Sequence, residues 1–288
     1  MIAGALPADP DTLSAGAGYV NVYNNQIQAN LGNDDGGGLR FLMAGDFPYN
    51  VYNNMVVNNV STHEGGGISI NDAPDVRVFN NTIMKNITTA TAMTSNGQPA
   101  PAGLSTSRNS ALLQSTLAKN APLFSEPLTF NNVFCDNRAG TFTGATVAGI
   151  GLMGDPGNVF HWDLGLQDQS LGQLMPTYSI LQTTYGTIPG GEGNIIGCDP
   201  GTLVVTTYDT SVQVQPWRGN PRFVDTLMVT ALADPNVLGD YHLASGASAI
   251  DVGAPSQGGI NAPGVDFDDQ IRPNNIVDMG ADEWYATP

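Results

Sequence analysis

The sequence predicts an all-β fold in which the chain winds as a three-sided solenoid of parallel strands, with about 27–29 residues per coil. Two observations predict this fold: an asparagine-rich pattern that occurs four times, and a Gly-Gly-Gly marker that occurs twice. The composition agrees, because 35 Gly, 19 Pro and only 12% charged residues favour short strands and turns over amphipathic helices.

The asparagine-rich pattern consists of an aromatic residue, Asn-Asn, one residue, an apolar residue, two residues and Asn. Successive copies are 29, 27 and 51 residues apart. A period of this size, in units that lack a 3.6-residue apolar stripe, fits strand-built coils better than helical repeats. The glycine marker supports the first spacing, because 36–39 recurs as 65–68. The four copies of the pattern lie at 20–30, 49–59, 76–86 and 127–137.

The first five residues align with 39–43 and 68–72, so the sequence begins inside a coil. No capping helix covers this edge, and a bare solenoid end exposes apolar core and unpaired strand groups. We therefore expect that the N-terminal edge is truncated and continues into a missing upstream segment. The alternative is an edge that stacks on another solenoid.

The second asparagine of each pair predicts a ladder along one corner of the solenoid. Asparagine tolerates the left-handed backbone conformation that a sharp corner needs, and stacked amides can hydrogen-bond from coil to coil. The predicted ladder is Asn25, Asn54, Asn81 and Asn132. The aromatic positions are predicted to stack in the same way, with a sugar platform as the alternative: Tyr23, Tyr52, Phe79 and Phe130.

The spacing of 51 residues predicts one coil that carries two enlarged turns, at about 88–102 and about 106–126. Gly103-Leu104 is interpreted as a degenerate copy of the glycine marker between these turns, and 110–119 has short-helix character. Regular coils are expected over 1–150, followed over 151–288 by the final coils and an irregular C-terminal β module that caps the solenoid. Long loops on a rigid scaffold often carry function.

The formal net charge of −17 predicts a surface that repels nucleic acid and anionic lipid. No apolar run is long enough to span a membrane, so we expect no membrane insertion. No signal peptide follows Met1. Cys135 and Cys198 are either two buried thiols, the reading that we favour, or a disulfide; the sequence alone does not fix the geometry.

A series of phrases follows the repeats in the C-terminal half. Their order resembles the C-terminal region of bacterial choice-of-anchor Q domain proteins, and the coils resemble the repeats of the same right-handed parallel β-helix (pectate-lyase-like) superfamily. The stretch 226–237 is longer than is usual there. The phrases are YSIL (178–181), GNII (193–196), GNPRFVD (219–225), DYHL (240–243), SAIDVG (248–253), GVDFDD (264–269), RP (272–273) and DMGADEW (278–284).

The resemblance implies a right-handed parallel β-helix that is secreted or exposed on the surface of a bacterium. It implies no single activity, because this fold hosts lyases, hydrolases, epimerases, adhesins and structural proteins.

The candidate catalytic residues are Asp34, Asp35, His63 and Glu64. Asp34-Asp35 and His63-Glu64 each precede a glycine marker, and the 29-residue spacing predicts that both pairs occupy the same turn of adjacent coils. Carboxylates at such a separation can share a proton, flank a glycosidic bond or hold calcium. A solvated polar turn is the alternative.

The candidate substrate-binding residues are Arg40, Phe160, His161 and Trp162. For the last three, a buried aromatic cluster is the alternative. Arg40 does not align with the other basic residues of the coils, so no basic stripe for a polyuronate is expected. This absence of a stripe argues against a lyase.

The candidate metal ligands are Asp266, Asp268, Asp269 and Asp278, in the densest acidic segment of the chain. Calcium is the cofactor considered, because it takes six to eight oxygen ligands. The alternative is an acidic cap whose charges meet Arg272 and backbone amides.

From these patterns we expect an extracellular, non-catalytic module that is structural, adhesive or carbohydrate-contacting. The expected partner is a polysaccharide or a cell-surface glycan. The alternative function is a polysaccharide lyase or glycoside hydrolase that acts on an extracellular polysaccharide.

Overall fold

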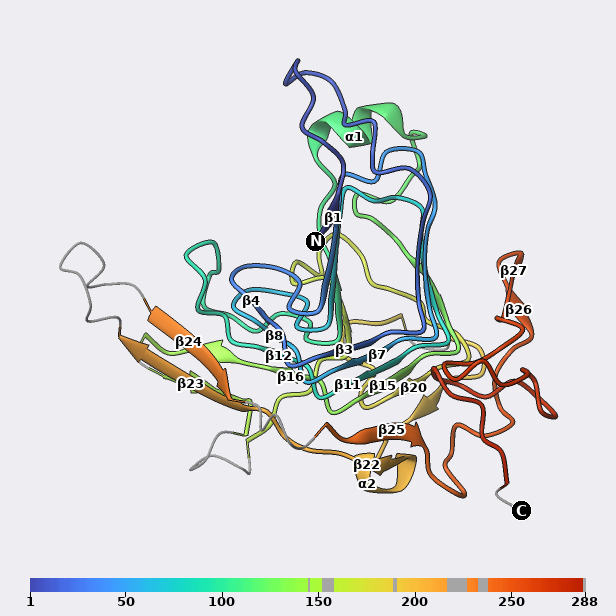
Figure 1. Ribbon diagram of the computed structural model, residues 1–288. Coiled ribbons are helices and arrows are strands. Elements are labelled where there is room, and N and C mark those ends of the chain that lie inside the picture. The colour runs from blue at the N-terminus through green and yellow to red at the C-terminus, as the bar shows by residue number, and fades with distance from the viewer. Residues whose placement is uncertain (145, 152–157, 189–190, 217–226, 233–237, 287–288) are drawn as a thin grey trace.

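The computed structural model describes residues 1–288 except 145, 152–157, 189–190, 217–226, 233–237 and 287–288. Over the described residues, short β-strands far outnumber the two helices. Most strands belong to parallel sheets that the chain visits in turn as it winds, and none of these sheets closes on itself. Figure 1 shows the stacked turns as nested outlines of similar shape. The all-β, parallel character that the sequence predicted is confirmed.

Four parallel sheets carry the repeats, and we name them A to D. Sheet A contains β1 (Ile2–Ala3), β5 (Leu39–Leu42), β9 (Ile68–Asn71), β13 (Leu104–Thr106) and β19 (Leu164–Gly165). Sheet B contains β2 (Val20–Tyr23), β6 (Tyr49–Tyr52), β10 (Val76–Phe79) and β14 (Leu128–Phe130). Sheet C contains β3 (Gln26–Gln28), β7 (Met55–Val57), β11 (Thr82–Met84), β15 (Val133–Cys135), β20 (Ile180–Leu181) and β21 (Ile195–Ile196). Sheet D contains β4 (Leu31–Gly32), β8 (Val60–Ser61), β12 (Ile87–Thr88) and β16 (Arg138–Ala139).

The remaining elements are short. The helices are α1 (Ala111–Thr116) and α2 (Pro200–Leu203). Antiparallel pairs join β17 (Thr141–Phe142) to β18 (Val147–Ala148), β22 (Val204–Thr206) to β25 (Asp240–Leu243), β23 (Ser211–Pro216) to β24 (Leu227–Leu232), and β26 (Ser256–Gln257) to β27 (Ile260–Asn261). Neither helix, within the residues that the structure describes, is long and apolar enough to cross a membrane.

The strand register confirms the predicted alignment of the repeats. Val22 pairs with Val51, which pairs with Val78 in the next coil. Ile68 pairs with Leu104, so Gly103-Leu104 is the third copy of the glycine marker. The two enlarged turns therefore lie where they were expected, between β12 and β13 and between β13 and β14.

The coil has a second bend that the sequence did not predict. The first residue of each Asn pair lies in the left-handed region, with φ between 51° and 53° from Asn24 to Asn131. Five residues later the chain bends again at Ala29, Asn58, Lys85 and Asp136, with φ between 54° and 56°. This second bend separates sheet D from sheet C, so each regular coil contributes to four parallel sheets instead of the three sides predicted.

The predicted asparagine ladder is confirmed. The amide of Asn25 donates to Oδ1 of Asn54 at 3.0 Å, Asn54 donates to Asn81 at 3.0 Å, and Asn81 donates to Asn132 at 3.1 Å. Each amide also donates to the backbone oxygen two residues earlier, for example Asn81 to Phe79. Asn54, Asn81 and Asn132 are fully buried, so these bonds satisfy groups that water does not reach.

A second ladder runs along the next corner, through the closing asparagines of the pattern. The donors Asn30, Asn59 and Asn86 reach the Oδ1 atom of the next asparagine at 2.9 to 3.0 Å. The ladder ends at Asp163, whose Oδ1 accepts from Asn137 at 3.0 Å. Sequence reasoning found these asparagines in the pattern without assigning them this role.

Asp163 ends the second ladder because both of its side-chain oxygens accept hydrogen bonds, and it has no amide group to donate one further. Its Oδ2 accepts from the backbone N–H groups of Gln182 and Thr183 at 2.7 and 3.2 Å. Asp163→Asn supplies only one acceptor oxygen and turns an NH₂ group toward donors. We expect the variant to lose about 1–3 kcal/mol of unfolding free energy, even though it removes a fully buried acid. Denaturant titration checks this, and a more stable variant would contradict it.

The aromatic residues of the pattern stack as predicted. The ring centroids of Tyr23 and Tyr52, of Tyr52 and Phe79, and of Phe79 and Phe130 are each 5.2 Å apart, with nearly parallel planes. Only the first ring is more than half exposed, at 51%. The stack is therefore mainly internal packing along sheet B.

Sheet C is apolar on both faces, and this explains how the C-terminal segment docks. The residues on one face, such as Val56, join the main hydrophobic core, which sheets A, B and C share. The residues on the other face, such as Met55 and Met84, pack against Tyr241 and Met279 of the C-terminal segment. In Figure 1, α2, β22 and β25 lie along the outside of sheet C, whereas β23 and β24 project to the left past sheet D.

The first asparagine of each pair fastens this segment. The side-chain amide of Asn24 donates to Asp269, that of Asn53 to the Val265 carbonyl, that of Asn80 to the Asp278 carbonyl and that of Asn131 to the Ala254 carbonyl, at 2.7 to 3.2 Å. The two asparagines of a pair thus have different tasks: one binds the C-terminal segment, and the other builds the ladder.

Three local predictions are corrected or decided. Ile2 pairs with Phe41, one residue away from the predicted alignment, because both side chains join the core. Ser110 caps α1, which ends before the predicted residue 119. Cys135 and Cys198 form a disulfide, with Cα atoms 6.0 Å apart, instead of two free thiols. The phrase at 219–225 lies outside the described residues.

Candidate functional site

The turn between sheets D and A brings Asp34-Asp35 and His63-Glu64 together, as the spacing predicted. In the first marker, the N–H of Gly36 donates to the Glu64 carbonyl, and those of Gly37 and Gly38 donate to the backbone of the marker in the next coil. Only glycine fits at Gly37, where a Cβ atom would lie 2.5 Å from the Val60 carbonyl oxygen. The glycine marker therefore allows the turns that precede it to stack closely.

Asp35 is the centre of the group. Its Oδ1 lies 2.7 Å from Nδ1 of His63, and its Oδ2 accepts from Arg40 at 2.9 Å. Its side chain is only 8% exposed. Arg40, predicted as a substrate-binding residue, therefore neutralises a candidate catalytic residue instead.

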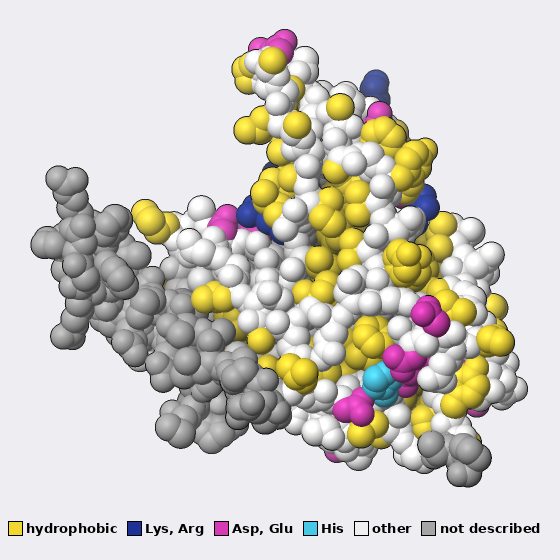
Figure 2. Space-filling view, viewed as in Figure 1, with side chains coloured by type: hydrophobic (Ala, Val, Ile, Leu, Met, Phe, Trp, Pro, Cys, Tyr) yellow, Lys and Arg dark blue, Asp and Glu magenta, His cyan; other side chains and the backbone are white. Residues whose placement is uncertain are grey.

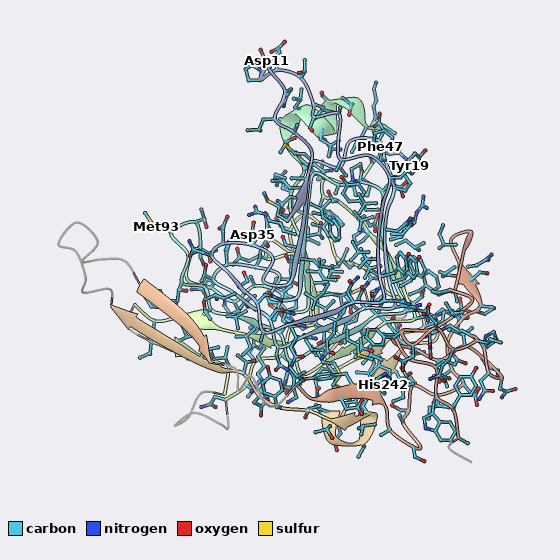
Figure 3. The ribbon with its side chains drawn as sticks, in the orientation of Figure 1. Asp11, Tyr19, Asp35, Phe47, Met93 and His242 are labelled. Carbon is cyan, nitrogen blue, oxygen red and sulfur yellow. A yellow bond between two sulfur atoms is a disulfide. The ribbon has the colours of Figure 1, made fainter. Side chains whose placement is uncertain are left out.

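Asp34 lies at the rim and is covered in part by the first enlarged turn. Oγ1 of Thr94 donates to Oδ1 of Asp34 at 2.6 Å. The backbone of the same turn is fixed by bonds from Thr91 and Ala92 to the Thr62 carbonyl, at 2.8 and 2.9 Å. Figure 3 shows the turn that carries Met93 beside Asp35.

Glu64 is buried, with an exposed fraction of 5%, and the N–H of the following Gly65 donates to the Pro101 carbonyl of the same enlarged turn at 2.9 Å. Burial raises the pKa of its carboxyl group to about 8, and the charge of Asp35 contributes to this rise. The pKa of His63 is raised as well, chiefly by its hydrogen bond to Asp35. At neutral pH the group therefore pairs a protonated carboxylic acid with a hydrogen-bonded carboxylate.

A proton donor beside a carboxylate is the pair that glycosidic hydrolysis requires. A metal ion is a poorer fit. Ligand atoms of Asp34, Asp35 and His63 lie within 4.8 Å of one another. The guanidinium of Arg40, however, already contacts both aspartates, at 3.5 and 2.9 Å, and repels a cation.

The aromatic candidates form a separate cluster. Phe160 and Trp162 pack edge-on against each other and against Tyr185, with centroids 4.7 to 6.2 Å apart. Trp162 is buried, and its indole N–H donates to the Leu164 carbonyl at 3.2 Å. Among the described residues, no hydrogen bond or ion pair joins this cluster to Asp35. The alternative of an aromatic packing cluster describes it better than a sugar site.

His161, predicted with these aromatic residues, belongs to an ionic network instead. Its Nε2 lies 3.1 Å from Oδ1 of Asp136, whose carboxylate also contacts Lys85 and Arg138 at 3.0 and 2.6 Å. Asp209 bridges the same two cations. The network ties residue 209 to the second bend of the coils, so we assign it a structural role.

The predicted calcium ligands do not converge. Asp266 accepts backbone N–H groups of Asp268, Gln270 and Glu283 at 2.8 to 3.1 Å. Asp278 accepts those of Asp251 and Trp284 at 2.6 and 2.7 Å. Both carboxylates are buried and used as caps for the backbone.

The other two predicted ligands point elsewhere. Asp269 binds Asn24, and Asp268 lies beside His242. Arg272 donates to the carbonyls of Asp278, Gly280 and Ala281 and lies 3.6 Å from Glu283. The predicted four-aspartate set is therefore corrected to an acidic network organised by backbone amides, which was the alternative.

Two residues that the sequence did not single out complete these groups. Thr94 closes the acidic cluster, and Tyr185 completes the aromatic one. Neither occupies a repeated position, so no spacing signal pointed to them.

Comparison with known proteins adds no residue, because no family model, curated protein or solved structure matches the chain.

Proposed function

We propose that the chain is a right-handed parallel β-helix of an extracellular or surface-exposed bacterial protein, and that it serves as a non-catalytic structural, adhesive or glycan-contacting module. The extracellular location and the right-handed β-helix are proposed from the resemblance of the sequence to choice-of-anchor Q proteins. The observation that supports it best is the closure of the acidic cluster. Asp35 already has two partners, Arg40 and His63, and Glu64 is only 5% exposed.

The proposal of a non-catalytic module rests on the poor access of a substrate to Asp35 and Glu64. A substrate must reach both the acid and the carboxylate of a catalytic pair. Here the bond from Thr94 to Asp34 holds the covering turn in place. The buried asparagine ladders and the net charge of −17 fit a rigid, soluble scaffold that favours neutral glycans over polyanions.

A glycoside hydrolase is the second candidate, and one observation favours it over a lyase. Burial gives Glu64 a pKa of about 8, so it keeps a proton to donate at neutral pH, next to the Asp35 carboxylate. In this case the turn at 88–102 must open to admit the sugar.

Polysaccharide turnover separates the two functions. A panel of neutral and acidic polysaccharides is scored for new reducing ends and for unsaturated uronates, with and without calcium. We expect no turnover by the wild-type chain, because the pair is enclosed. Glu64→Gln removes the buried acid, and Glu126→Gln makes the same change at an exposed glutamate. Turnover that survives in Glu126→Gln and vanishes in Glu64→Gln would establish the hydrolase instead.

A further inference from the structure

A second group of potential ligands lies in the C-terminal segment, away from the glycine turns. It contains His242 of β25, Asp268 of the loop after β27, and Asp282 near the C-terminus. Ligand atoms of these three residues lie within 4.8 Å of one another. Figure 3 places His242 at the outer side of the docked segment, and Figure 2 shows a histidine there between acidic side chains at the surface.

The imidazole of His242 is oriented from one side. Its Nδ1 lies 2.6 Å from Oδ1 of Asp240. This contact favours the tautomer in which Nδ1–H donates to the carboxylate, and it leaves the lone pair of Nε2 pointing the other way. The ring also packs edge-on against Phe267, with centroids 5.9 Å apart. A carboxylate on one nitrogen is the usual support of a histidine that binds a metal through the other.

The second nitrogen faces another carboxylate without a proper hydrogen bond. Nε2 lies 2.9 Å from Oδ2 of Asp268, yet this buried atom makes no hydrogen bond of acceptable geometry. Two lone pairs at this distance repel each other unless a cation lies near both. Adjacent ligands of one metal ion, each about 2.1 Å from it, are themselves about 3.0 Å apart at an octahedral angle and about 3.4 Å apart at a tetrahedral one, so 2.9 Å lies at the short end of this range. The contact therefore has the spacing of two ligands of one ion.

Asp282 supplies a third, rigid carboxylate. It is 5% exposed, and its Oδ2 accepts from the backbone N–H of Leu243 at 2.8 Å. Among the described residues, neither lysine nor arginine forms an ion pair with Asp240, Asp268 or Asp282. The site thus differs from the cluster at Asp35, where Arg40 supplies the positive charge.

We propose that His242, Asp268 and Asp282 bind a divalent transition-metal ion of the Zn²⁺ type, with Asp240 as the residue that positions the imidazole. One imidazole and two carboxylates suit Zn²⁺ and its neighbours, whereas Ca²⁺ takes oxygen ligands almost exclusively. Water completes the coordination. The ion links β25 to the loop at 266–270 and to the terminal segment, and so fastens the docked segment. Protons compete with the ion for Nε2, so binding weakens as the pH falls.

The test uses Zn²⁺ as the probe on the full chain after treatment with EDTA. Calorimetry is expected to give one ion per chain for the wild type, with a rise in melting temperature. His242→Gln is expected to lose at least 100-fold in affinity, and Asp268→Asn, at a half-exposed side chain, at least tenfold. His63→Gln is the matched control, because it removes a histidine from the other His-Asp group and is expected to bind like the wild type.

The three histidines of the chain allow a direct readout. Zn²⁺ is expected to shift the imidazole NMR signals of one histidine, and His242→Gln removes that signal. Wild-type affinity in His242→Gln, or loss of binding in His63→Gln, overturns the proposal. Ca²⁺ that stabilises the wild type as much as Zn²⁺ overturns the assignment to a transition metal. If His242→Gln does not fold, Asp268→Asn decides in its place.

Discussion

Asn81→Ala is expected to lower the free energy of unfolding by about 3–6 kcal/mol. The side chain is fully buried and takes part in five hydrogen bonds. Its Nδ2 donates to the carbonyls of Val51 and Phe79 and to Asn132, and its Oδ1 accepts twice from Asn54, all at 2.8 to 3.1 Å. Alanine leaves several buried partners unsatisfied at about 1–3 kcal/mol each, reduced where a water molecule enters.

Asn25→Ala is the matched control for this prediction. Asn25 occupies the same position of the pattern in the first coil, but it is exposed. In the variant, water can therefore replace the hydrogen bonds that the Asn25 amide donates to the Tyr23 carbonyl and to Asn54. We expect a loss below about 1 kcal/mol. Urea unfolding of the three proteins measures both effects. Equal losses in the two variants would show that the ladder stabilises through backbone conformation and not through buried hydrogen bonds.

The ladder was predictable because it repeats. Strands that stack in register place the same residue at the same corner of every coil, so the physical demand at Asn54 recurs at Asn81 and leaves a spacing signal. The second bend left no such signal. Ala29, Asn58, Lys85 and Asp136 all take the left-handed conformation, yet they share no residue type.

The docking of the C-terminal segment could not be read from the sequence for a different reason. The contacts of Asn24 with Asp269 and of Asn53 with Val265 span 245 and 212 residues and involve one partner each. No period connects such partners. No repeat links His242 to Asp268 and Asp282 either, and calcium was instead assigned to aspartates of which Asp266 and Asp278 cap the backbone.

The acidic cluster was predictable in its membership and not in its chemistry. The 29-residue spacing placed Asp34-Asp35 and His63-Glu64 at the same turn of adjacent coils, where the structure adds the contact of Asp35 with His63. The partial cover of Asp34 depends on the enlarged turn of the next coil, where Thr94 has no counterpart in the repeat. How far the acidic cluster is enclosed decides between a scaffold and an enzyme, and this could be learned only from the structure.

Glu64→Gln is expected to make the protein progressively more stable than the wild type as the pH rises from 5 to 8. The carboxyl pKa is raised from 4.5 to about 8 by burial and by the charge of Asp35. Between these values the unfolded chain releases the proton and the folded chain keeps it, so the wild type loses stability with rising pH by about 1.4 kcal/mol per unit. Glutamine does not titrate, and the difference between the two proteins should grow by about 4 kcal/mol and level off above pH 8.

Denaturant titrations of both proteins at several pH values from 5 to 9 measure this difference, in which the background of the titrating groups that do not interact with Glu64 cancels. Glu126→Gln makes the same change at an exposed site, and its difference from the wild type should stay nearly constant with pH. A constant difference for Glu64→Gln as well would mean that water or a moving turn reaches the carboxyl group. That outcome would remove the argument for an enclosed cluster and favour the hydrolase, because a turn that opens to water can also open to a sugar.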